Sequence, residues 1–151
     1  MPVRFDMFSQ FNIARARWPL DDPRMAGFTQ NIGRLNSLAR RSPGYVWRLE
    51  DEEGPDAPKF PDDPLMTFTL SVWEDVESLR AFTWSTIHKR FRMRRDEWFQ
   101  PFDGPYLAIW PIAHDHRPDG QEALAMLEQL TREGPSTSVF GTETLAPVPA
   151  Q

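Results

Sequence analysis

The sequence predicts an α+β fold of ferredoxin-like β-α-β-β-α-β order, an antiparallel sheet with two helices on one face, followed by an extra C-terminal helix. Three observations predict it. Four segments have the alternation or the β-branched and aromatic composition of strands, three have apolar residues at helical spacing, and they occur in that order. At 151 residues the chain is most simply one domain. We expect this domain to span residues 1–135 and residues 136–151 to form an extended or disordered tail.

The first half of the chain supplies a strand, a helix and a second strand. Residues 5–13, FDMFSQFNI, alternate as a strand does. Asp21 or Asp22 is a natural N-cap for a helix that runs through Arg41, because one apolar stripe recurs at steps of three and four: Met25, Phe28, Ile32, Leu35 and Ala39. The SPG sequence ends this helix, and GYVWRLE reads as the next strand.

The second half begins after an acidic, proline-rich surface loop, DEEGPDAPKFPDDPL. LMTFTLSVW is the clearest strand, and Asp75 can cap a second helix that the segment WSTIHKRFRMRRDEWF, residues 84–99, continues after a bend. YLAIWPI predicts the last strand, AHDHRPDG a loop, and EALAMLEQLTREG a third amphipathic helix.

The two sides of the third strand differ in polarity. We expect Met66, Phe68, Leu70 and Val72 to lie beneath the helices. The other face would then carry Phe8, Gln10, Asn12, Thr67, Thr69, Ser71 and Trp73. That face is too aromatic to be left in water and too polar for an ordinary core, so we expect a second copy of the chain to cover it. The pattern therefore predicts a homodimer with a partly polar cavity.

Composition excludes several classes of protein. The net charge is −5 and the pI about 5.2, which is the wrong sign for a dedicated nucleic-acid binder. There are no cysteines, so disulfides, thiolate catalysis and cysteine-based metal sites are excluded. No window is apolar enough to cross a membrane, and the start, MPVRFDMFSQ, lacks the features of a signal peptide, so we expect a cytoplasmic protein.

Six stretches carry a family resemblance: QFNIAR, DPRMAGF, SPGYVWRL, SVWEDVESLRAFTWSTIH, RRDEWF and GPYLAIW. They resemble a family of bacterial proteins known only as a domain of unknown function. That family is placed in the dimeric α/β-barrel superfamily, beside the antibiotic-biosynthesis monooxygenase-like proteins. The likeness covers roughly residues 5–135. It implies the fold and the dimer, and it leaves the function open among cofactor-free oxygenases, haem-degrading enzymes, isomerases, stress proteins and ligand sensors.

His88, Asn12 and Arg48 are the candidate catalytic residues. An imidazole titrates near neutrality, so His88 beside a cavity could be a general base, although a packed helix histidine is the alternative. For Arg48 the cheaper register puts Tyr45, Trp47 and Leu49 under the helices and the guanidinium on the cavity side, where it could bind a carboxylate or phenolate. A surface salt bridge is equally compatible with Arg48.

The predicted substrate pocket contains further residues: Gln10, Thr69, Trp84, Arg92 and His116. Arg90, Arg94 and Arg95 are expected to face water and to pair with Asp96, Glu97 or a neighbour. His114 and His116 form a His-x-His pair that could begin a metal site, but the segment offers no third ligand, so no metal is assigned.

Haem is a third possibility raised by the resemblance. Haem-degrading members of the superfamily use an Asn on the first strand with a Trp and a His on this helix, and Asn12, Trp84 and His88 are the same residue types. Here, however, Trp84 and His88 are only four residues apart, and Lys89 and Arg90 follow directly. No cofactor is therefore assigned.

The leading hypothesis is a small-molecule-binding dimeric barrel that acts as a cofactor-independent monooxygenase-like or isomerase-like enzyme. It would act on an aromatic or carbonyl metabolite with His88 as general base. The alternative is a non-catalytic ligand-binding or stress-associated protein with the same pocket. A haem protein is the third reading. The sequence identifies neither the substrate nor the reaction.

Overall fold

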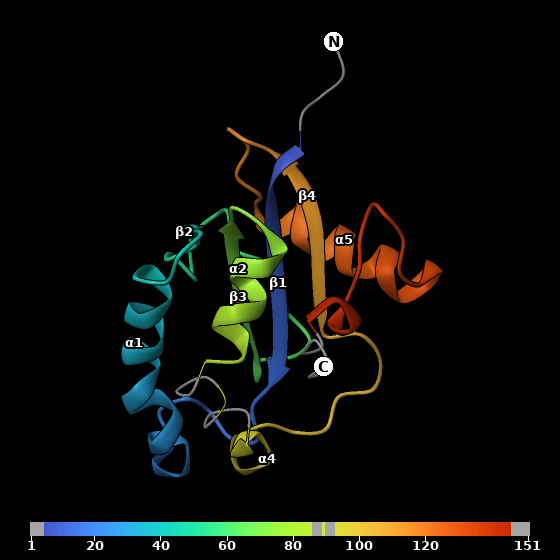
Figure 1. The fold of residues 1–151 in the computed structure, drawn as a ribbon. Coiled ribbons are helices and arrows are strands. Elements are labelled where there is room, and N and C mark those ends of the chain that lie inside the picture. The colour runs from blue at the N-terminus through green and yellow to red at the C-terminus, as the bar shows by residue number, and fades with distance from the viewer. Residues whose placement is uncertain (1–4, 86–88, 90–92, 146–151) are drawn as a thin grey trace.

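A computed structural model describes residues 5–85, 89 and 93–145, and it confirms the predicted fold. Four strands form one antiparallel sheet in the order β2-β3-β1-β4 (Figure 1). The strands are β1 Phe5–Arg15, β2 Tyr45–Arg48, β3 Met66–Trp73 and β4 Leu107–Ala113. β1 is central and pairs with β3 on one side and β4 on the other.

The helices begin at the predicted caps. Asp22 accepts a hydrogen bond from the backbone N–H of Arg24 at the start of a 3-10 turn, Pro23–Met25, which leads into α1, Ala26–Arg40. Asp75 caps α2, Val76–Thr83, and the C-terminal helix α5 is Gly120–Glu133.

The basic segment 84–99 is described only in part. α2 ends at Thr83, a four-residue helix α4 covers Arg95–Trp98, and residues 86–88 and 90–92 lie outside the described residues. The predicted continuation of the second helix through this segment therefore falls largely on residues outside the described ones. Trp98 and Phe99 pack with Ala16 and Met25 in a small cluster, which fixes α4 near the start of α1. In the described part of the chain no helix is both long and apolar enough to span a bilayer.

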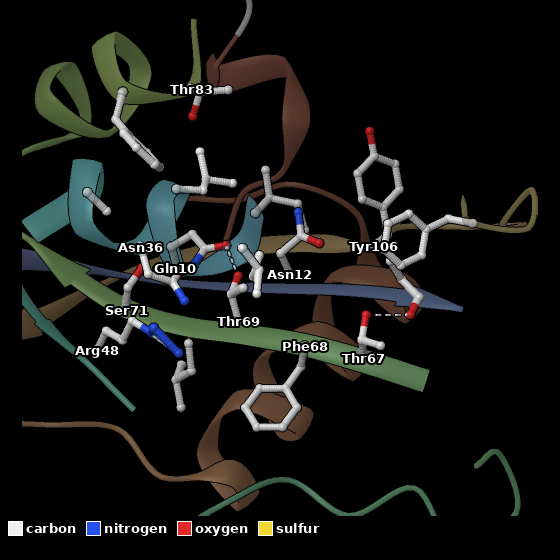
Figure 2. A pocket seen from close by; sticks show the side chains of 18 of the residues that line it. Gln10, Asn12, Asn36, Arg48, Thr67, Phe68, Thr69, Ser71, Thr83 and Tyr106 are labelled. Atoms are coloured by element: carbon white, nitrogen blue, oxygen red, sulfur yellow. Dashed lines mark hydrogen bonds between the residues drawn. The ribbon is translucent and has the colours of Figure 1, made fainter. Parts of the chain in front are cut away.

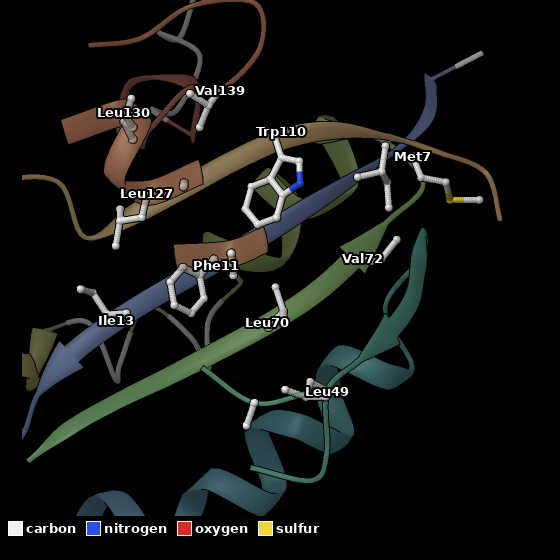
Figure 3. Close-up of a cluster of buried hydrophobic side chains, with 14 residues drawn as sticks. Met7, Phe11, Ile13, Leu49, Leu70, Val72, Trp110, Leu127, Leu130 and Val139 are labelled. Atoms are coloured by element: carbon white, nitrogen blue, oxygen red, sulfur yellow. The ribbon is translucent and has the colours of Figure 1, made fainter. Parts of the chain in front are cut away.

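The two faces of the sheet are assigned the opposite way from the prediction. Phe11, Leu70 and Val72 pack with Leu127 and Leu130 of α5, not with α1 and α2 (Figure 3). The face predicted to be open is the one beneath α1 and α2, because Trp73 clusters there with Ala39 of α1 and Leu79 of α2. The acidic loop completes the cover on the α5 side, where Ala57 and Leu49 are buried in the same cluster.

A bulge in β2 changes the predicted register of its side chains. Tyr45 pairs with Trp73, but the register shifts before Trp47, which pairs with Val72, while Arg48 pairs with Ser71. Tyr45 and Arg48 therefore share the face beneath α1 and α2, and Trp47 lies on the α5 face. The prediction that Tyr45, Trp47 and Leu49 share one face was wrong, because strict alternation does not hold across a bulge.

One of the two arguments for the predicted homodimer, the argument from sheet polarity, does not hold; the other is the family resemblance. The argument from sheet polarity required one open sheet face, and both faces are covered by the chain itself. Among the described residues, the large apolar side chains that are exposed are Leu20 and Met93. Self-association stays a prediction, which light scattering of the purified protein would test.

Part of the predicted tail belongs to the fold. Phe140 and Ile109 exchange two backbone hydrogen bonds across an antiparallel bridge, so residues 139–141 protect the free edge of β4. A 3-10 turn, Thr142–Leu145, follows, and Val139 and Leu145 are buried. The domain therefore extends at least to residue 145, while residues 146–151 lie outside the described part.

Candidate small-molecule site

A cavity of about 790 Å³ lies between the sheet and the helices α1 and α2. Its floor is a strip of polar side chains that cross β1, β3 and β2, and they project toward the helices (Figure 2): Gln10, Asn12, Thr67, Thr69, Ser71 and Arg48. A volume of several hundred cubic ångströms with a few convergent polar groups is typical of small-molecule sites. The polar face that suggested a dimer cavity is therefore the floor of a cavity within one chain.

Two hydrogen bonds to Ser71 hold the buried part of the floor. The amide Nε2 of Gln10 and the indole Nε1 of Trp73 both donate to Ser71 Oγ, at 2.9 and 3.0 Å. Thr69 Oγ1 donates to Gln10 Oε1 at 3.2 Å. An indole can only donate, so its bond fixes Ser71 Oγ as an acceptor. The network leaves these side chains with one arrangement, and it makes the floor rigid.

Three polar groups beside this network have little or no hydrogen bonding within the described residues. The side-chain amides of Asn12 on β1 and Asn36 on α1 line the cavity, and neither makes a hydrogen bond to a described residue. The Arg48 side chain is 15% exposed, and its nearest carboxylate, Glu52, lies 3.7 Å away, beyond hydrogen-bonding distance. Asn12, Asn36 and Arg48 therefore retain donors for a bound molecule.

Aromatic side chains form the two ends of the cavity. At one end the Trp73 ring stacks on Phe82 with centroids 5.4 Å apart and meets Tyr45 edge-on at 5.6 Å. At the other end Phe28 packs against Trp98 and Phe99, with centroids 5.8 and 5.0 Å apart. Such surfaces favour a flat, largely apolar ligand whose polar groups face the floor.

Trp84 closes part of the cavity from the end of α2. Its indole N–H donates to the backbone carbonyl of Leu145 at 2.6 Å, and Arg80 donates to the carbonyl of Thr144 at 2.6 Å. Leu145 also lines the cavity. The C-terminal segment thus holds α2 and Trp84 in place over the sheet.

The structure brings together five of the residues predicted from the sequence: Gln10, Asn12, Arg48, Thr69 and Trp84 all line the cavity. His88 and Arg92 lie outside the described residues. His116 is placed elsewhere. Its Nε2 lies 2.6 Å from Glu122 Oε1 at the start of α5, and Glu122 Oε2 accepts a hydrogen bond from Trp110. His116 therefore holds the β4–α5 loop and does not line this cavity.

Of the predicted histidines, the structure describes His114 and His116. Within the described residues, no three His, Asp or Glu side chains are arranged to hold a metal ion, and His114 is exposed. None of the described residues that line the cavity is a histidine. The described residues thus give no direct support for a haem site.

Sequence reasoning missed Asn36, Arg95 and Tyr106, all of which line the cavity. Arg95 was expected to face water beside Arg94. Arg94 does pair with Glu97, at 2.7 Å, but the Arg95 guanidinium lies over the Tyr106 ring, 4.6 Å from its centroid. A helical wheel drawn over residues 84–99 treats them as one helix. In the structure α4 is a separate helix that starts at Arg95, so the wheel does not reveal that Arg94 and Arg95 have different surroundings.

The profile of the family described as Domain of unknown function (DUF3291) matches residues 7–151. No curated protein matches the chain.

Solved structures share the fold at low sequence identity. A candidate antibiotic biosynthesis monooxygenase from Nitrosomonas europaea is 12% identical with a TM-score of 0.53, covering 78% of this chain and 99% of that protein. A protein from Shewanella oneidensis is 8% identical with a TM-score of 0.54, covering 74% and 95%. SnoaB, a cofactor-independent oxygenase from Streptomyces nogalater, is 15% identical with a TM-score of 0.49, covering 76% and 99%. Likeness at these identities shows a shared fold alone.

Proposed function

We propose that the cavity of this chain, which belongs to the family described as Domain of unknown function (DUF3291), binds a small aromatic or carbonyl metabolite. We further propose that the protein is a cofactor-independent monooxygenase-like or isomerase-like enzyme. The observation that carries the proposal is the cavity itself, with aromatic ends, a rigid polar floor, and donors on Asn12, Asn36 and Arg48 that no described residue occupies.

In this proposal His88 is the general base. It removes a proton from a phenolic hydroxyl or from carbon next to a carbonyl, and negative charge develops on the substrate oxygen. The amide N–H of Asn12 and the guanidinium of Arg48 stabilise that charge. The electron-rich anion then isomerises, or a methylene group of it reacts with dioxygen. In the second case the methylene becomes a carbonyl, and the other oxygen atom leaves with the two hydrogens as water, so no external reductant is needed.

One observation supports a second candidate, a ligand-binding protein without turnover. Within the described lining the carboxylates are Glu52 and Glu53, and Glu52 is the residue beside Arg48. No described residue of the lining is a histidine, so the general base of the proposed reaction is assigned to His88. If His88 is not directed at the ligand, the same cavity binds without reaction.

A His88→Ala variant separates the two candidates. In the enzyme it should retain the affinity for the substrate and lose turnover by about 10²–10⁴-fold, the usual contribution of a general base. The measurement is a single-turnover assay with the molecule that co-purifies with the protein from cells, identified by mass spectrometry. A search for a Soret band in the same preparation tests haem directly. Unchanged turnover in His88→Ala would exclude the proposed base.

An Arg48→Ala variant tests the polar floor. It is expected to weaken binding of a phenolate by about 10- to 100-fold, since a hydrogen bond to a charged group contributes roughly 1.5–3 kcal/mol. A neutral anisole of the same shape should be affected less than threefold. Isothermal titration calorimetry of both ligands is the measurement, and Arg40→Ala, which removes an exposed arginine paired with Glu50, is the matched control. Equal weakening of both ligands would show that Arg48 only supports the fold.

A further inference from the structure

We infer, in extension of the proposed function, that the ligand of this cavity carries a permanent anionic group such as a carboxylate, and that Arg95 binds this group beside Tyr106. Arg95 would then be a specificity-determining residue. This anionic group is separate from the part of the ligand that reacts in the proposed function.

Arg95 lies where two cavities meet. It lines the main cavity, and together with Tyr106 it also lines a smaller one of about 220 Å³ that Gln100, Pro101 and Phe102 help to form. Its guanidinium is held over the Tyr106 ring at 4.6 Å. Stacking on a ring fixes the plane of a guanidinium and leaves its N–H edge available, and that edge can bind a carboxylate through two parallel hydrogen bonds.

The charge of Arg95 is not neutralised by a described residue. No hydrogen bond or ion pair joins its guanidinium to any carboxylate in the described part of the chain. Its neighbour Arg94 differs: Arg94 pairs with Glu97, and the hydrogen bond from Arg94 holds the pKa of Glu97 below its usual value. A half-buried cation without a counter-ion is costly unless water or a ligand compensates it.

The other charged groups around the cavity also favour binding of an anion at the Arg95 end. Glu52 and Glu53 line the main cavity with Arg48, and Glu52 offsets the positive charge of Arg48. Asp96 lines the small cavity only. Two carboxylates therefore reduce the attraction of the Arg48 end for an anion, whereas Arg95 is not offset by a described carboxylate of the main cavity, so a permanent anion is attracted more strongly at the Arg95 end.

The placement of the two ends suits a ligand with a separate anionic group. Figure 2 shows Arg48 and Tyr106 at opposite ends of the drawn pocket, with Thr69 and Asn12 between them. A molecule whose charged group lies at Arg95 would therefore extend its ring over Asn12 and Thr69. The reacting oxygen would lie toward Asn12 and Arg48, as the proposed function requires.

Two fluorescent probes of nearly the same shape test this inference. 8-Anilinonaphthalene-1-sulfonate is an anion, and N-phenyl-1-naphthylamine is the same molecule without the sulfonate; both become bright in apolar cavities. Arg95→Gln is expected to weaken binding of the anionic probe at least tenfold and binding of the neutral probe less than twofold. Arg95→Lys, which keeps the charge, should restore part of the difference. Arg94→Gln is the matched control and should change neither probe.

Each outcome has a distinct meaning. If Arg95→Gln weakens binding of both probes equally, Arg95 only supports Tyr106. If it changes binding of neither probe, the anionic group lies elsewhere. Both results overturn the inference and leave the proposed function intact. A Thr69→Trp variant, which fills the floor, should abolish binding of both probes. If wild-type protein binds neither probe, or if Thr69→Trp binds both as tightly, the cavity does not take such ligands and the proposed function itself fails. Near-ultraviolet circular dichroism of each variant establishes that it is folded.

Discussion

A Gly120→Ala variant is expected to unfold at a markedly lower urea concentration than the natural sequence, with a loss of about 2–4 kcal/mol in the free energy of unfolding. A Cβ atom at position 120 would lie 2.2 Å from the backbone N of Pro58 and 2.5 Å from the carbonyl carbon of Ala57. Both obstacles are backbone atoms, so no side-chain rotation can relieve the overlap. The acidic loop would have to move away from α5, losing the 2.6 Å hydrogen bond from Gly120 N to the carbonyl of Asp56.

Gly33 provides the control for this prediction. It lies within α1, and a Cβ built there meets no atom within 4 Å. Gly33→Ala should therefore raise the free energy of unfolding by about 0.5–1 kcal/mol, because alanine is the better helix former. Urea titrations followed by tryptophan fluorescence measure both variants. If Gly120→Ala were as stable as Gly33→Ala, the acidic loop would not be in contact with α5 as described.

A chain that ends at Gly134 is expected to be less stable by about 3–5 kcal/mol, or not to fold at 37 °C. It lacks the buried side chains of Val139 and Leu145, which are 0% and 7% exposed. It also loses the backbone bridge to Ile109 and the two carbonyls that accept hydrogen bonds from Arg80 and Trp84. Because Leu145 lines the cavity, this chain should also bind the neutral probe poorly.

Two point variants show whether that loss comes from packing. Leu145→Ala should account for about 2–4 kcal/mol of it, as a truncated buried leucine usually does. Thr137→Ala, at an exposed position, should change the free energy of unfolding by less than about 0.5 kcal/mol. If a chain ending at Gly134 has the same free energy of unfolding as the 151-residue chain, residue 135 is the domain boundary after all.

The secondary structure could be predicted because its signals are local. Each strand has its apolar or β-branched pattern in a few consecutive residues, and Asp22 and Asp75 cap the helices that follow them. The order of those elements was enough for the ferredoxin-like fold. None of this required knowing which residues meet across the sheet.

The faces of the sheet could not be assigned in this way. Alternation separates Leu70 from Thr69, but it does not say which helix covers which side. The sequence-based prediction places the first two helices, α1 and α2, on the most apolar face of the sheet. The structure instead puts α5 on that face and uses α1 and α2 as the roof of a polar-floored cavity. The bulge in β2 then moves Tyr45 onto the same face as Arg48, a change that no pattern in YVWR reveals.

The site was predicted in part for a similar reason. Gln10, Asn12, Thr69 and Arg48 share one face of neighbouring strands, so the sheet brings them together once the strands are recognised. Arg95 at the start of α4 and Tyr106 meet across an irregular connection, residues 99–106, that leads to β4. A contact made across an irregular connection leaves no periodic signal in the sequence.

The bonds from Arg80 and Trp84 to residues 144 and 145 have a consequence for how the protein is made in the cell. A ribosome releases the chain from its N-terminus, so the sheet partners β1, β2 and β3 emerge well before these carbonyls do. Throughout that interval α2 and Trp84 lack the hydrogen bonds that hold them over the sheet. The aromatic rings of Trp73 and Phe82 then line a cavity that is not yet closed. Nascent chains stalled before residue 145 should therefore recruit holdase chaperones and should not bind the neutral probe.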